Sequence, residues 1–244
     1  MSLGPDKRYG VRTDSMSSSD SYAAGIDVGL RAYMLQVYNY MASGLALTGI
    51  VAYLTASSEA MTQAIFGTPL MWVVMLAPIG LVIFLSARLE HMKASTAQTV
   101  FWIFSVLMGL SMASIFLQFT GTSIARVFFI TAGTFAAMSL YGYTTKKDLS
   151  SWGSFLFMGL IGIFIAMIVN MFLKSSAMAF VISVVGVLVF VGLTAYDTQK
   201  IKAMYLEADD SETYTKKAII GATNLYLDFI NLFIMLLHLL GDRR

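Results

Sequence analysis

The sequence predicts an all-α membrane protein: a seven-transmembrane-helix bundle with the last helix central. Composition indicates the membrane, because 57% of the 244 residues are hydrophobic and only 12% are charged. A soluble domain averages about 25% charged residues. So few charges cannot cover a water-facing surface, so we expect lipid to cover most of it. Seven long apolar segments and a polar stripe along the last of them complete the prediction.

Each apolar segment is long enough to cross the membrane, since about 20 residues of helix span a hydrocarbon core of about 30 Å. The segments are residues 33–55, 70–87, 98–118, 124–143, 153–173, 178–196 and 219–240. Their connections are short, the longest running from about residue 197 to 218, so we expect one transmembrane domain over residues 25–244. Residues 1–24 are polar and lack an apolar run, which predicts a disordered cytoplasmic tail and no cleavable signal peptide.

Lysine and arginine set the orientation. Twelve of the 16 basic residues fall in the N-terminal tail and in the second, fourth and sixth connections, all on one side of the membrane. Cytoplasmic loops carry such an excess. We therefore expect a multi-pass protein of the plasma (cell inner) membrane, with its N terminus in the cytoplasm and its C terminus outside.

Small residues recur at helical spacing in several segments, which is typical of helices that pack closely in lipid. The glycines in these rows are Gly44, Gly109, Gly133, Gly159 and Gly162. We expect them at helix–helix contacts and assign them no other function.

The seventh segment carries polar residues at steps of three and four, which places them on one helix face. The stripe consists of Gly221, Asn224, Asp228, Asn231, Met235 and His238, among Leu, Ile and Phe elsewhere. Such a face has to contact protein or water, so the helix is expected at the centre of the bundle. Helix–helix hydrogen bonds would explain Asn224 and Asn231, whereas an acid inside the membrane, such as Asp228, usually marks an ion or proton path.

A second carboxylate, Asp197, closes the sixth segment in GLTAYDTQK. That segment runs inward and the seventh starts at the cytoplasmic face, so Asp197 and Asp228 are expected at similar depth in the cytoplasmic half. Alone, Asp197 could be an interfacial residue in water, and the depth that it shares with Asp228 makes this interpretation less favoured. Arg88 and Glu90, at the end of the second segment, reach the same level. Arg88 is either a counter-ion, whose fork matches carboxylates, or an anchor that extends to the headgroups.

The residues present exclude several functions. The chain has no cysteine and therefore no thiolate metal site. It lacks zincin and phosphate-loop motifs, and its last segment has no lysine for a retinal Schiff base. A net charge of +2 does not indicate a nucleic-acid partner. We expect no enzymatic activity, no tightly bound cofactor and no nucleic-acid binding.

Four stretches together resemble the Bax inhibitor-1 family, also called the transmembrane Bax inhibitor motif family. They are LRAYMLQVYNYMASGLALTG, YGYTTKKDLSSWGSFLFMGLIG, GLTAYDTQKIK and NLYLDFINLFIMLLHLLG, and they extend from the first segment to the last. The resemblance implies a last helix surrounded by six others, calcium leak across the membrane, sensitivity to pH and a link to protection from cell death. It also implies that Asp197 and Asp228 are the sensing aspartates and that Arg88 is a latch.

These observations predict a prokaryotic-type, pH-sensitive calcium leak channel gated by the Asp197–Asp228 pair. Two neighbouring carboxylates cannot both ionise at low cost, so they can share a proton. Once deprotonated they could bind calcium, the transported ion, with backbone carbonyls, water and possible accessory ligands Glu90, Asn224 or Asn231. The expected partners are the lipid bilayer, calcium and protons. Two alternatives stay open: a non-conducting regulator that binds a protease or another membrane protein, and a proton-coupled transporter.

Overall fold

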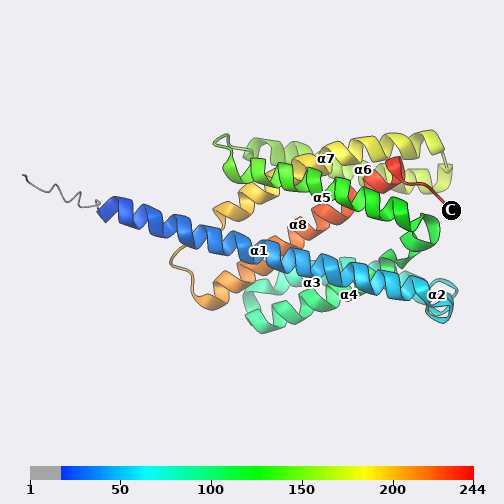
Figure 1. The fold of residues 1–244 in the computed structure, drawn as a ribbon, viewed down its shortest axis with the longest axis horizontal. Helices are drawn as coiled ribbons and strands as arrows, with labels where there is room; N and C mark the ends of the chain where they lie inside the picture. Colours follow the sequence, from blue (N-terminus) through cyan, green and yellow to red (C-terminus); the bar gives the residue numbers. More distant parts are fainter. Residues whose placement is uncertain (1–17) are drawn as a thin grey trace, which may run out of the picture.

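A computed structural model describes the backbone of residues 18–244 and the side chains from residue 28 onward. The described chain folds into eight α-helices and one 3-10 turn (Figure 1). They are α1 (Ser18–Ser57), α2 (Glu59–Phe66), α3 (Leu70–Arg88), η1 (Leu89–His91), α4 (Ala94–Gln118), α5 (Gly121–Thr144), α6 (Ser150–Leu173), α7 (Ser176–Ala203) and α8 (Ser211–Leu240).

All of these α-helices except α2 are long and apolar enough to cross a membrane, which confirms the seven predicted segments within the described chain. The short helix α2, between the first and second spans, was not predicted. The helices also extend beyond the apolar segments predicted from the sequence, since α7 continues to Ala203 and α8 already begins at Ser211. The expected long connection over residues 197–218 is therefore reduced to residues 204–210.

Charged ends explain these extensions. Lys200 and Lys202 occupy the last turn of α7, where positive charge stabilises the partial negative charge of a helix C terminus. At the start of α8, the carboxylate of Asp210 accepts a hydrogen bond of 2.6 Å from the backbone N–H of Thr213. This capping bond lowers the pKa of Asp210 from its ordinary value. Both helices thus continue into water past the apolar segment.

The predicted N-terminal tail lies mostly outside the described residues, which begin at residue 18. Where the prediction of disorder overlaps the structure, at residues 18–24, the chain is helical and forms the start of α1. The polar composition that suggested disorder therefore does not stop α1 from extending well before its apolar part.

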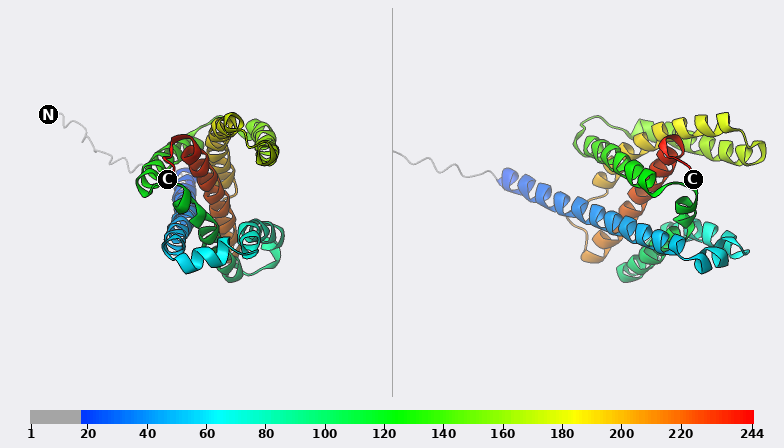
Figure 2. Two further views of the ribbon diagram at one scale, coloured as in Figure 1. Left: turned by 90° about the vertical axis from the view of Figure 1, so that its right-hand side faces the viewer. Right: turned by 45° about the vertical axis from the view of Figure 1, so that its right-hand side comes forward.

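Helix α8 is the centre of the bundle, as predicted. In its apolar stretch 72% of the residues are buried, against 11% in α6. It runs obliquely between α1, α3 and α4 on one side and α5 and α7 on the other, and the further views show the same arrangement (Figures 1 and 2). Helix α6 packs mainly on α7, at the outside of the bundle, so α8 is not evenly surrounded by six helices as the family resemblance implied.

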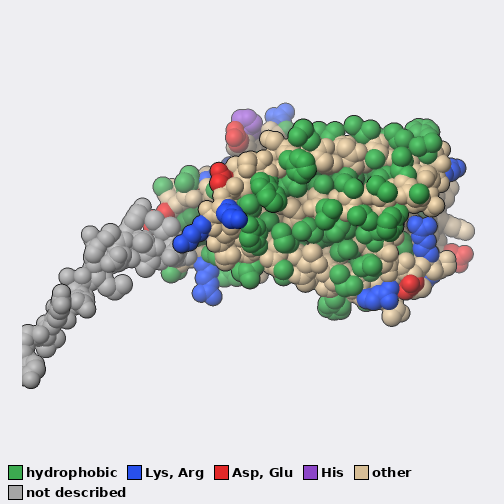
Figure 3. Space-filling model, turned by 90° about the horizontal axis from the view of Figure 1, so that it is seen from above, with side chains coloured by type: hydrophobic (Ala, Val, Ile, Leu, Met, Phe, Trp, Pro, Cys, Tyr) green, Lys and Arg blue, Asp and Glu red, His purple; other side chains and the backbone are tan. Residues whose placement is uncertain are grey.

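The outer surface matches a lipid environment. Large apolar side chains are exposed along the spans, among them Trp72, Phe129, Phe155, Phe172 and Leu188. Figure 3 shows hydrophobic side chains over the middle of one face, with charged side chains gathered toward its two ends. Apolar groups that would be unfavourable in water are favourable in hydrocarbon, so these helices are stable only with lipid around them.

Glycines bring several helix pairs into close contact. A Cβ atom added to Gly109 would lie 2.8 Å from the backbone oxygen of Thr48, and one on Gly142 would lie 2.2 Å from the oxygen of Ala195. The packing prediction is also confirmed at Gly44 and Gly159. It is wrong for Gly133 and Gly162, where an added Cβ would meet nothing within 4 Å.

The contact between α5 and α7 gives a test of this packing. We expect Gly142→Ala to lower the free energy of unfolding by about 1–3 kcal/mol, because the new methyl group would push against the backbone of α7. Gly133→Ala, in the same helix, should be neutral or slightly stabilising, since alanine favours helix without a clash. Thermal unfolding in detergent measures both, and equal stability of the two variants would contradict the close approach.

Candidate functional site

The two aspartates lie on neighbouring helices and face each other. Asp197 is in α7 and Asp228 in α8, and the two carboxyl groups are neighbours across the interface between these helices. The side chain of Asp228 is only 5% exposed, whereas Asp197 is half-buried. Two neighbouring carboxyl groups that are shielded from water cannot both ionise at low cost, so this arrangement suits a pair that holds one proton.

Packing between α7 and α8 creates this proximity. Gly221 leaves room for Ile201, whose nearest side-chain atom would lie 3.0 Å from an added Cβ. On α7, Thr194, which precedes Asp197 by three residues, is buried and small. Small residues on facing helices let the backbones approach, which brings the short aspartate side chains into contact.

Asp228 is incompletely satisfied in this arrangement. Its Oδ2 atom is buried and has no hydrogen-bond partner among the described residues. A buried polar atom without a partner is costly and needs a physical explanation, such as a water molecule or an ion. No group of three or more His, Asp or Glu side chains converges in the described chain. A cation at Asp228 would therefore take its other ligands from backbone carbonyls and water.

Arg88 does not touch the pair. It is the exposed last residue of α3, and within the described chain it forms no ion pair with Asp197 or Asp228. Glu90 follows in η1, where its backbone carbonyl accepts a hydrogen bond of 3.5 Å from Lys216. The latch role of Arg88 and the accessory role of Glu90 stay predictions.

A cation close enough to Asp197 to act on its charge is Lys200, three residues further along α7. Residues three apart lie on the same side of a helix, so the spacing in YDTQK could have revealed it. The sequence interpretation considered only Arg88, because arginine suits carboxylates best, and it treated Lys200 as part of a loop.

The two asparagines of the stripe contribute less than expected. Asn231 donates its side-chain hydrogen bond to the carbonyl of Leu227 in its own helix, at 2.9 Å. Asn224 is half-buried and makes no side-chain hydrogen bond with the described residues. Neither asparagine bonds across to another helix within this part of the chain, and their role as accessory ligands stays a prediction.

A chain of hydroxyl groups beside the pair was not anticipated. Tyr38 of α1 shares a hydrogen bond with Ser139 of α5, and Ser139 shares one of 3.0 Å with Thr198 of α7. Thr198 is the neighbour of Asp197 in the sequence. The chain therefore connects three helices to the level of the pair. Hydroxyl residues are common in apolar helices. Tyr38 and Ser139 are 101 residues apart in the sequence, and Ser139 and Thr198 are 59 apart, so no sequence pattern predicts these hydrogen bonds.

Both ends of the bundle are tied by polar contacts. At the α7–α8 connection, the ammonium group of Lys217 lies 2.6 Å from the carboxylate of Asp209 and donates to the carbonyl of Met204. At the opposite end, Arg126 of α5 forms an ion pair of 3.1 Å with Asp242. The backbone N–H of Thr120 also donates to the carbonyl of Asp242, at 3.0 Å. The chain after α8 is thus fastened to the connection between α4 and α5.

Comparison with known proteins places the whole bundle in one family. A family model described as inhibitor of apoptosis-promoting Bax1 matches residues 30–244. An uncharacterized protein of Rickettsia prowazekii is 51% identical over 89% of this chain and 92% of its own length. The inner membrane protein YbhL of Escherichia coli is 49% identical over 88% of this chain and 94% of its own. An uncharacterized membrane protein of Streptococcus pyogenes is 33% identical over 88% of this chain and 94% of its own length.

Infrared spectroscopy tests directly whether the pair holds a proton. We expect a carbonyl band of a buried protonated carboxyl group near neutral pH, and we expect Asp197→Asn and Asp228→Asn each to remove or shift it. Asp148→Asn is the matched control, because hydrogen bonds from the side chain and backbone of Ser150 lower the pKa of this exposed carboxyl group. A band unchanged in both pair variants would show that no proton is held there.

Proposed function

The chain belongs to the Bax inhibitor-1 family, and we propose that it is a pH-sensitive calcium leak channel gated by the Asp197–Asp228 pair. One observation carries the proposal: a buried acid on the central helix of an apolar bundle has a second acid as its neighbour on the helix beside it. Acids are rare inside membrane helices because they are costly there, and they usually mark ion or proton paths.

Protonation provides the switch. While one proton is held between the two carboxyl groups, the pair carries at most one negative charge and joins α7 to α8. Loss of that proton leaves two negative charges side by side. At an effective dielectric constant of about 20, two unit charges 4 Å apart repel by roughly 4 kcal/mol. Repulsion of this size is enough to shift an equilibrium between joined and separated helices.

A cation relieves the same repulsion. Calcium takes six to eight oxygen ligands, of which the pair supplies up to four. The unpartnered oxygen of Asp228 is available for a ligand bond. Because carbonyls and water would have to complete the shell, binding would be weak. Weak binding suits an ion that has to leave again, as conduction requires.

Calcium flux into liposomes that contain the purified protein tests the proposal. We expect flux that falls as the pH is lowered, because protonation rejoins the pair. In Asp197→Asn, in Asp228→Asn and in the double variant, the pair can no longer acquire two charges. Flux should therefore be low and nearly independent of pH.

Asp148→Asn serves as the control, since Asp148 is exposed in the connection between α5 and α6. Wild-type flux and pH response in the double variant would refute the gating role of the pair. If the wild-type protein passes no calcium, but a pH gradient drives uptake of another solute, the chain is a transporter instead.

The proposed path assumes that α1 begins in the cytoplasm, which the absence of native cysteine makes easy to test. We expect Lys146→Cys to react with a membrane-impermeant maleimide only after the cells are opened. Glu59→Cys, in α2 on the opposite side, should react in intact cells. Both positions are exposed, so the reverse pattern would place the pair in the outer half of the membrane.

A further inference from the structure

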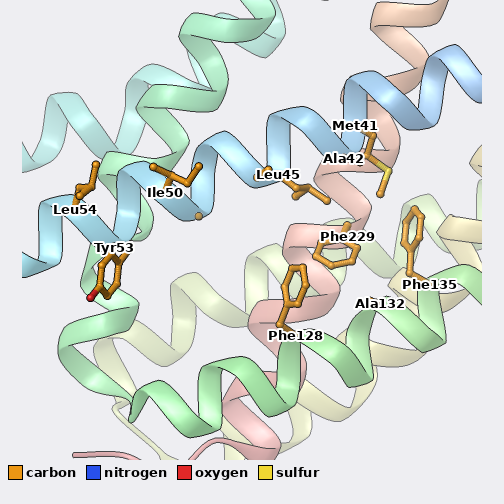
Figure 4. A pocket seen from close by; sticks show the side chains of 12 residues that line it. Met41, Ala42, Leu45, Ile50, Tyr53, Leu54, Phe128, Ala132, Phe135 and Phe229 are labelled. Carbon is orange, nitrogen blue, oxygen red and sulfur yellow. The ribbon is translucent and has the colours of Figure 1, made fainter.

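A groove separates α1 from α5 on one side of the bundle. Helix α1 packs against α4 and α8, and α5 packs against α7 and α8, whereas α1 and α5 meet at few points, one of which is the hydrogen bond between Tyr38 and Ser139. The central helix α8 passes between them. Figure 4 shows side chains of α1, α5 and α8 directed into this space, with Phe229 of α8 between Leu45 and Phe128.

The groove consists of three adjoining cavities. One of about 660 Å³ lies between residues 41–54 of α1 and residues 128–135 of α5. A second, of about 490 Å³, shares Met41, Ala42 and Phe135 with the first. A third, of about 290 Å³, shares Leu45 and Phe128 with the first. Together they follow α1 from residue 31 to 54, about 35 Å at 1.5 Å per residue, which matches the thickness of the hydrocarbon core.

The lining is apolar along most of this length and carries a charged side chain at one end only. The first cavity is lined almost entirely by aliphatic and aromatic side chains, among them Leu45, Ile50, Phe128 and Phe229. The second cavity adds Arg31, Tyr38, Ser139 and Tyr143. Just behind it, the ammonium group of Lys202 lies 5.0 Å from the centre of the Tyr143 ring and 2.9 Å from the Tyr143 carbonyl.

We propose that this groove is a binding site for an anionic phospholipid of the surrounding bilayer. An acyl chain would lie along the apolar part, and the phosphate would lie at the end that carries Arg31, with Lys202 nearby. Charge complementarity supports the assignment, because a guanidinium binds phosphate oxygens in a fork. The basic end of the groove is also the predicted cytoplasmic end, where anionic headgroups attract lysine and arginine.

The shape of the groove favours a lipid over a helix of another protein. The space is divided into cavities of about 660, 490 and 290 Å³, whereas a helix is a single rod about 10 Å wide or more. A helix of a partner protein, or of a second copy of this chain, would enter the groove with only part of its width. Acyl chains are narrow and flexible enough to fill the space between Leu45 and Phe229.

Gly49 makes the site testable without disturbing the fold. It lines two of the cavities, and a Cβ atom added there would meet nothing within 4 Å. Leucine at this position would therefore fill the groove rather than clash with the bundle. Gly162 is the matched control, since it is also an exposed glycine of a spanning helix with open space around it, but it lies on α6.

The experiment is native mass spectrometry of the protein released from nanodiscs of phosphatidylcholine and phosphatidylglycerol. We expect the wild-type protein and Gly162→Leu to retain phospholipid, with phosphatidylglycerol preferred, and Gly49→Leu to lose it. Arg31→Gln should retain lipid but lose the preference, whereas Lys146→Gln, which removes an exposed cation outside the groove, should keep it. If Gly49→Leu does not fold, Ala46→Leu blocks the same cavity.

Three results would overturn the proposal. One is equal lipid retention in Gly49→Leu and Gly162→Leu, and another is an unchanged preference in Arg31→Gln. The third is a dimer that Gly49→Leu abolishes, which would assign the groove to a second copy of the chain. None of these measurements involves calcium, so the lipid site and the proposed channel activity stand or fall separately.

Discussion

The structure depends on how a carboxyl group can exist in the middle of a bundle that is itself surrounded by lipid. Asp228 has no access to bulk water, and an isolated charge in hydrocarbon is very costly. Its position is tolerable only if another polar group meets it, and Asp197 is that group. Two neighbouring acids repel each other once both are ionised, so a proton or a cation between them would stabilise the pair. If the pair acts as we propose, the same contact would hold α7 to α8 and respond to pH.

The rest of the bundle follows from that contact. Helix α8 is enclosed because its polar residues cannot face lipid, and α7 approaches it closely because Gly221 leaves space for Ile201. On its other side α7 meets α5 just as closely, at Gly142. The hydroxyl chain from Tyr38 through Ser139 to Thr198 extends these connections to α1. A change at the pair thus has a short physical route to α1 and α5, the helices that border the groove.

The sequence predicted what hydropathy controls and missed what side-chain placement controls. The seven spans and the central α8 were predictable, because lipid imposes length on every helix and excludes polar stripes from the outside. The ends of α7 and α8 were not, since Lys200, Lys202 and Asp210 stabilise helix in water, beyond any hydropathy signal. Arg88 was expected near the pair on depth alone, whereas its contacts depend on which way the end of α3 points.

The glycines show the same difference between what the sequence predicts and what depends on helix arrangement. Gly109 and Gly133 look alike in the sequence, yet one lies against a neighbouring backbone and the other faces open space. Small residues predict that a close approach is possible, and only the arrangement of the helices decides where it happens. The groove between α1 and α5 was unpredictable for this reason.

The position of α8 also bears on how the protein is made. Residues 211–240 are synthesised after the other spans, and chains fold from the N terminus as they emerge. The first six spanning helices therefore enter the bilayer before the helix that they pack around exists. Until then, the hydroxyl and carboxyl groups facing the centre have no α8 to contact. A chain that ends before α8 would lack the central helix of the bundle and not a peripheral one. Membrane proteases would then encounter six helices that have not assembled around a core.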